Sequence, residues 1–117
     1  MSGPLTTEAR QAEFVRFVRS RPRSVQQLML DWPPLCVVRA RDEIKLLVPA
    51  PGVEGTVQSY SENGDLGIVA PATLPHPEHG WGTVTPGQLL AATVKADWLV
   101  LVREGEWSRA DVEAAIS

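Results

Sequence analysis

Apolar residues in the first third of the chain recur at helical spacing. The first set, at i, i+3 and i+4, is Phe14, Phe17 and Val18. It predicts a helix that Thr6 or Thr7 caps and that runs to about Ser20, because Pro22 excludes the helical conformation from the residue before it. The second set, at i, i+3, i+4 and i+7, is Val25, Leu28, Met29 and Trp32. It predicts a short amphipathic helix over 24–32 that must pack against other elements to be stable.

From Leu35 onward the apolar period becomes two, which is typical of strands. Residues 35–40 are rich in β-branched side chains, and over residues 43–48 the apolar Ile44, Leu46 and Val48 alternate with Glu43, Lys45 and Leu47, which predicts a half-buried strand. Two further apolar runs, 56–60 and 66–70, flank the dipeptide Asn63-Gly64. Because this dipeptide favours positive φ at both central positions, we expect an antiparallel hairpin with a type I′ turn.

The last third of the chain is less regular. Residues 71–82 hold three prolines and two glycines and predict a long loop, and Trp81 to Val84 predict a short strand. Residues 88–95 fit either a strand or a helical turn. Residues 98–102 are apolar at every position, so we expect a central strand there. We expect both Trp98 and Trp32 to lie in the core.

Two sequences match capping boxes, the side-chain pattern that begins many helices. One is Ser24 to Gln27, at the start of the second predicted helix. The other is Ser108 to Asp111, which follows Gly105 and predicts a short C-terminal helix.

Helices and strands are therefore segregated along the chain, which predicts an α+β fold. Short strands joined by tight turns tend to close into a small barrel. We expect one compact domain with a helical extension over 1–33, a barrel of five or six strands over 34–104 and a C-terminal helix over 105–117.

Residues 35–103 resemble the small SH3-like β-barrels, including those of the KOW type. The motifs that carry the resemblance are the turn Gly52-Val53-Glu54-Gly55-Thr56-Val57, the hairpin dipeptide Asn63-Gly64, and the turn Ala96-Asp97-Trp98-Leu99 before the last strand. The resemblance implies the barrel fold, but such barrels serve many functions. The two N-terminal helices and the 71–82 loop lie outside the pattern.

The composition sets broad limits. The chain has 117 residues, a net charge of −3 and one cysteine, Cys36, which cannot form an intrachain disulfide. The N-terminus has no secretory pattern, and the longest wholly apolar run, 98–102, is too short to cross a bilayer. We therefore expect a soluble cytoplasmic protein with no membrane partner.

Positive charge gathers near the N-terminus. Arg16, Arg19, Arg21 and Arg23 could contact phosphate, with Arg16 and Arg19 on one helix face. An ordinary solvated face is the simpler interpretation. Helix-turn-helix recognition of DNA needs a third helix before the strands, and no aromatic residues alternate with the arginines as in single-strand binding.

Two groups carry possible chemistry. His76 and His79 could ligate zinc, but Pro77 between them removes the helical spacing and further ligands would have to come from Cys36 or a distant acid, so we expect no metal and no cofactor. Cys36 lies among apolar residues, so we expect a small buried side chain rather than a nucleophile.

The sequence thus contains no catalytic set, and we expect a protein that is not an enzyme. The leading hypothesis is an accessory or regulatory module that acts by protein–protein contact, with Trp81, His76 and His79 forming the partner-binding surface. Alternatively, Trp81 has a structural role and covers the mouth of the barrel. The alternative function is a nucleic-acid-associated KOW-like module using the basic N-terminal helix, and a metal-dependent enzyme using the two histidines is a third class.

Overall fold

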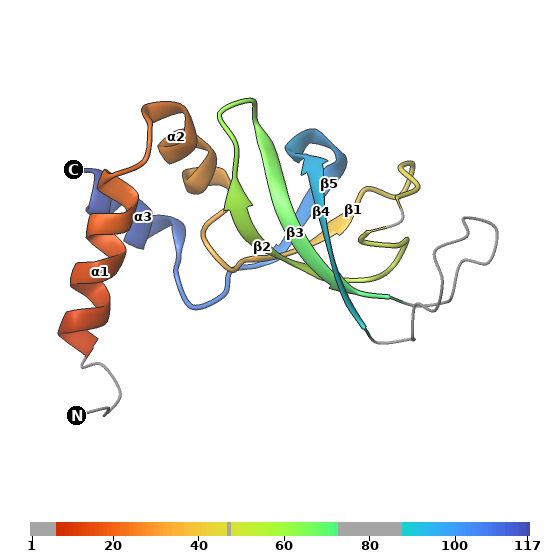
Figure 1. The fold of residues 1–117 in the computed structure, drawn as a ribbon, viewed down its shortest axis with the longest axis horizontal. Coiled ribbons are helices and arrows are strands. Elements are labelled where there is room, and N and C mark those ends of the chain that lie inside the picture. Colours follow the sequence, from red (N-terminus) through yellow and green to blue (C-terminus); the bar gives the residue numbers. More distant parts are fainter. Residues whose placement is uncertain (1–6, 47, 73–87) are drawn as a thin grey trace.

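The computed structural model describes residues 7–46, 48–72 and 88–117. In these residues the fold is α+β, with helices at one end of an elongated molecule and a β-sheet at the other (Figure 1). The elements in chain order are α1 (Thr7–Arg19), α2 (Arg23–Asp31), β1 (Val37–Ala40), β2 (Gly55–Tyr60), β3 (Asp65–Pro71), β4 (Leu89–Lys95), the 3-10 turn η2 (Ala96–Trp98), β5 (Leu99–Arg103) and α3 (Arg109–Ile116). None of the described helices is long and apolar enough to cross a membrane.

The five described strands form an antiparallel sheet in the order β4-β3-β2-β1-β5. This sheet is open, with β4 and β5 as its edges. The sequence left two possibilities for residues 88–95, and all of them except Gln88 form strand β4. The prediction of a central strand over 98–102 is wrong, because β5 pairs with β1 alone and Trp98 belongs to the turn before it. An all-apolar run here marks an edge strand rather than a central one.

The hairpin of β2 and β3 is confirmed, but its turn is not of type I′. Among non-glycine residues in the described part, positive φ occurs at Leu35, so Asn63 has the ordinary sign, while Gly64 has a φ of 90°. The Gly64 amide donates to the Ser61 carbonyl at 3.3 Å, and the Ser61 amide donates to the Asp65 carbonyl at 3.0 Å. This is the three-residue hairpin loop in which a type I turn precedes a left-handed glycine.

The prediction of a strand over 43–48 is also wrong. Residues 41–46 and Val48 are irregular, and the Ile44 amide closes a local turn on the Arg41 carbonyl at 2.9 Å. A strand needs a neighbour to satisfy its backbone, and both sides of β1 are already taken by β2 and β5. The strand predicted over 81–84 lies outside the described residues.

The helix starts differ from each other. At α2 the capping box of Ser24 and Gln27 is wrong, because the helix begins at Arg23 directly after Pro22, whose side chain offers no cap. At α3 the predicted box is present: the Ser108 amide donates to Asp111 Oδ2 at 2.8 Å, and the Asp111 amide donates to Ser108 Oγ at 3.1 Å.

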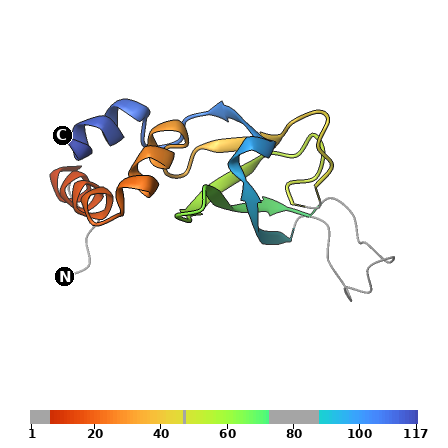
Figure 2. The same ribbon diagram turned by 90° about the horizontal axis from the view of Figure 1, so that it is seen from above.

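Two apolar clusters make up the core. The sheet cluster consists of Cys36, Val38, Val57, Leu66, Ile68, Val94 and Leu99. The helix cluster consists of Phe14, Val18, Val25, Met29, Val112 and Ala115. Helix α2 contributes to both, since Val25 and Met29 belong to the helix cluster while the half-buried Leu28 and Trp32 pack on the sheet cluster. In Figure 2, α2 accordingly lies between the sheet and the pair α1 and α3.

Tyr60, at the end of β2, joins the two clusters. Its ring packs against both, and its hydroxyl donates to the Trp32 carbonyl at 2.6 Å. At the far side of the helices, Phe14 stacks on Trp107 with ring centroids 4.0 Å apart. Residues from both ends of the chain therefore build the helical part of the molecule, which meets the sheet through α2.

Gly64 gives a direct test of the hairpin. Gly64→Val should lower the free energy of unfolding by more than about 1 kcal/mol, because a β-branched residue is strained at positive φ. Space is not the limit, since nothing lies within 4 Å of a β-carbon placed there. Urea unfolding measures the change, with Glu62→Ala in the same exposed turn as control. An unchanged midpoint in Gly64→Val would contradict this turn geometry.

Candidate interaction surfaces

Two groups of residues were candidates from the sequence. Trp81, His76 and His79 lie outside the described residues, so the structure is silent on the surface they were expected to form. The four arginines of the N-terminal segment are all described. The structure gives them different environments.

Arg19 is part of the scaffold. Its Nε donates to the Ala115 carbonyl at 2.9 Å and its Nη2 donates to the Ser117 carbonyl at 2.8 Å. These carbonyls lie at the C-terminal end of α3, where helical carbonyls lack partners within the helix. Arg10 on the same helix forms an ion pair with Glu106. Arg19 therefore holds α1 against α3, and it does not share the environment of Arg16.

Phe17 lies on the outside of α1. The sequence placed it on one apolar helix face with Phe14 and Val18, but 44% of its surface is exposed while those two are buried. The Arg21 guanidinium lies over the Phe17 ring, 5.2 Å from the centroid, and donates from Nε and Nη2 to Ser20 Oγ at 3.3 Å. A cation over an aromatic face is attracted to it and leaves the rest of the ring free for contact.

Phe17 is shared by two hollows in the surface. One has a volume of about 350 Å³ and lies between the α1–α2 turn and β2, with Phe17, Arg21, Pro22, Val25 and Tyr60 among its walls. The other, of about 420 Å³, is a shallow depression along α1 lined by Glu13, Arg16, Phe17 and Ser20. We call Phe17, Arg16, Arg21 and Pro22 the Phe17 surface.

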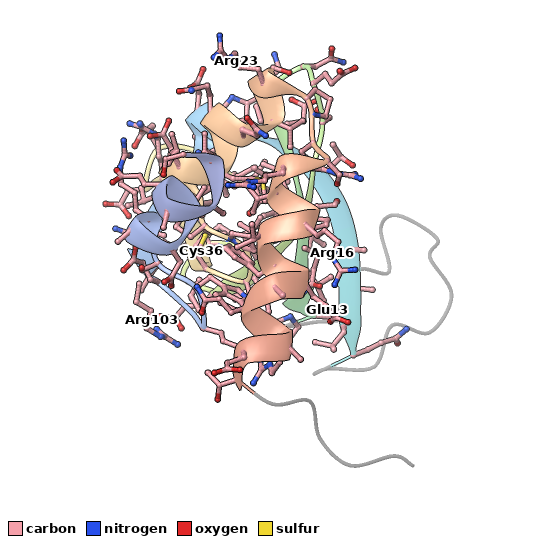
Figure 3. All side chains as sticks on the ribbon, turned by 90° about the vertical axis from the view of Figure 1, so that its left-hand side faces the viewer. Glu13, Arg16, Arg23, Cys36 and Arg103 are labelled. Atoms are coloured by element: carbon pink, nitrogen blue, oxygen red, sulfur yellow. The ribbon has the colours of Figure 1, made fainter. Side chains whose placement is uncertain are left out.

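Arg16 and Arg23 are exposed, and neither side chain forms an ion pair or hydrogen bond with a described residue. Figure 3 shows Arg16 beside Glu13 on the flank of α1, whereas Arg23 projects from the start of α2. Glu13 and Glu62 line the two hollows with Arg16 and Arg21, so the formal charges around Phe17 balance.

A third hollow lies on another side of α2. It has a volume of about 590 Å³, and its walls include Asp31, Trp32, Arg41, Asp65 and Lys95. Its charges are mixed and partly compensated, since Asp31 pairs with Arg109 at 3.2 Å and Lys95 lies over the Trp98 ring, 5.5 Å from the centroid. The prediction that Trp98 belongs to the core is wrong, because the turn η2 leaves its ring at the surface.

Cys36 lies fully buried in the sheet cluster. Burial raises the pKa of its thiol from 9.0 to about 12, and the charge of Glu104 adds to the rise. Burial likewise raises the pKa of Tyr60 far above its usual value. A protonated, enclosed thiol is a poor nucleophile. In residues 7–46, 48–72 and 88–117, no group of three or more histidine, cysteine, aspartate or glutamate side chains is placed to hold a metal ion.

The exposure of Phe17 had a signal in the sequence. Glu13, Ser20 and Arg21 occupy positions i−4, i+3 and i+4 around it, so three of its four neighbours at helical spacing are polar. Phe14 and Val18 instead lie toward the predicted second helix. Weighing these neighbours would have placed Phe17 at the edge of the apolar stripe.

No family model, no curated protein and no solved structure matches this chain. The candidate surfaces therefore rest on geometry alone.

The buried thiol predicts a pH dependence. In the unfolded chain Cys36 ionises near pH 9.0, while in the folded chain its pKa is about 12, so the free energy of unfolding should fall as pH rises through this interval. Denaturant titrations at several pH values measure it. Cys36→Ala should remove the fall that begins near pH 9 and make the fall shallower up to about pH 12, leaving above about pH 10 the part due to Tyr60. Equal slopes in the two proteins would contradict the buried position of the thiol.

Proposed function

We propose that this chain is a non-enzymatic accessory or regulatory module that works by binding another protein. The observation that supports the proposal is the Phe17 surface, where an aromatic ring remains 44% exposed beneath an arginine and between two hollows. Aromatic and arginine side chains dominate the energetic centres of protein interfaces, where they insert into or line pockets.

The chemistry of the surface indicates how a partner would bind. The hollow of about 350 Å³ beside Phe17 has the size to take an apolar side chain, with Pro22, Val25 and Tyr60 as its walls. Arg21 lines this hollow and Arg16 lines the neighbouring one, and both would pair with acidic groups around that anchor. Arg21 is already held over the ring, so it loses little side-chain freedom on binding.

Trp81, His76 and His79 remain part of the proposal as a second contact region on the 71–82 segment. An aromatic residue between two glycines offers a large contact area, as an anchor does. A cytoplasmic location belongs to the same proposal, consistent with a single cysteine that is buried and free.

We also propose that the sheet is of the SH3-like type. Three features support this: β1 lies between β2 and β5, the hairpin of β2 and β3 follows the Gly52–Val57 turn, and a 3-10 turn leads directly into the last strand. The turn also requires its glycine, since a β-carbon on Gly55 would lie 2.7 Å from Ile68 Cγ2.

The alternative is a nucleic-acid-associated module of the KOW type. Arg16, Arg21 and Arg23 favour it, because none of them forms an ion pair with a described acid. Arg19 does not contribute, since α3 holds its guanidinium. The neighbouring Glu13 and Glu62 and the net charge of −3 oppose polyanion binding.

Binding to a partner isolated from the native host tests the role of Phe17. Phe17→Ala should weaken the complex by at least about 2 kcal/mol, roughly 30-fold in Kd, because an aromatic anchor is lost. Its stability should change little, since much of the ring is exposed. Leu89→Ala is the control, because Leu89 is 68% exposed on β4, away from this surface.

Isothermal titration of each variant gives the Kd. An unchanged Kd in Phe17→Ala, with a loss in Trp81→Ala, would move the interface to the 71–82 segment. Retention of the intact chain on immobilised RNA that falls steeply with salt, and that Arg16→Ala and Arg23→Ala reduce, would replace the proposal by the nucleic-acid alternative.

A further inference from the structure

The Phe17 surface presents the same chemistry that its own hollow would bind. The hollow of about 350 Å³ has the size to take an apolar side chain, and Arg21 on its wall would pair with an acidic group beside that side chain. Helix α1 carries such a combination, because the Phe17 ring is 44% exposed and Glu13 lies about one helical turn before it. The surface is therefore chemically complementary to itself.

The charges around Phe17 are balanced and are not neutralised by ion pairs within the described chain. Glu13 and Glu62 line the two hollows together with Arg16 and Arg21. None of these four side chains forms an ion pair with a described residue. A surface of one sign would repel a second copy of the chain, whereas a balanced surface can meet its copy with opposite charges facing each other.

Glu13 and Arg21 lie on opposite sides of Phe17 along the chain direction of α1. Glu13 precedes Phe17 within the helix, while Arg21 follows the helix end, where its amide donates to the Val18 carbonyl at 3.1 Å. A twofold axis perpendicular to α1 beside Phe17 reverses this direction in a second copy. It brings Glu13 of each copy to the side on which the other copy holds Arg21, so that the opposite charges meet twice.

We propose that a second copy of this chain occupies the Phe17 surface when no other partner is bound, with the two α1 helices antiparallel about this twofold axis. Each Phe17 ring enters the other copy's hollow, and each Glu13 pairs with the other copy's Arg21. The inference rests on the proposed function, because it names an occupant of the same surface, and another partner that binds there must displace the second copy. A twofold contact of this type closes after two copies.

Charge reversal tests this pairing while leaving the Phe17 ring in place. Sedimentation of the full chain by itself from about 1 μM to about 1 mM should show a dimer. Glu13→Arg and Arg21→Glu should each weaken the dimer about tenfold, because two contacts of opposite charge become contacts of like charge. An equal mixture of the two variants should dimerise about tenfold more tightly than either alone, since opposite charges face each other again in the mixed dimer.

Asp97→Arg and Arg41→Glu are the matched controls, with the same changes of net charge. Both side chains are exposed at the hollow on another side of α2, and neither forms an ion pair with a described residue. Each control should keep the wild-type Kd, and circular dichroism establishes that every variant is folded. A dimer that the controls weaken equally, or one that the mixture does not restore, overturns the inference.

The chain by itself separates this inference from the proposed function. A chain that stays monomeric up to about 1 mM overturns the inference and leaves the role of the surface to the titration with a host partner. If the chain dimerises as expected and Phe17→Ala leaves the Kd for the host partner unchanged, the proposed role of Phe17 fails while the inference holds.

Discussion

The rest of the structure depends on the two-sided packing of α2. Met29 is fully buried on the side of α1 and α3, and Leu28 and Trp32 pack on the sheet cluster. A helix of nine residues is too short to be stable in water by itself. It exists because apolar surface is buried on both sides, and it thereby joins two clusters that would otherwise be separate. Tyr60 adds a second connection, through a hydroxyl bonded to the backbone at the end of the same helix.

This arrangement also explains where the candidate surfaces lie. Because α2 stands between the sheet and the other helices, hollows form on different sides of it. One exposes Phe17 and Arg21 beside the α1–α2 turn. The arginines divide accordingly, since Arg19 satisfies carbonyls of α3 while Arg16 and Arg23 project away from the helix cluster. Whether an arginine side chain is available to bind a partner therefore depends on its position relative to α3 more than on its charge.

Local patterns in the sequence predict much of this fold. The apolar period identifies α1, α2 and the hairpin, and Ser108 and Asp111 identify the start of α3. What they miss are facts about neighbours that are distant in the sequence. The alternation over 43–48 is typical of a half-buried strand, but both sides of the neighbouring β1 are already paired, so no partner strand is left for it. The apolar run at β5 does not show which edge of that strand is paired.

The candidate site was predictable to a smaller degree. The sequence identifies the arginines as candidates, but it does not show that α3 returns to bind Arg19 or that Phe17 faces outward beside them. The hairpin turn illustrates the same limit on a smaller scale. Asn63-Gly64 correctly predicts a reversal with positive φ at the glycine, yet Ser61 hydrogen bonds select a longer loop.

Native-state hydrogen exchange tests the central claim that α2 unites the helices and the sheet into one cooperative unit. Exchange rates would be measured for the amides of α1, α2, α3, β1, β2 and β3 under increasing denaturant. If α2 joins the two clusters, the slowest amides of the helices and of the sheet should open with the same free energy and the same dependence on denaturant. A sheet that stays protected after the helices have exchanged would show that the helical layer is an independent appendage.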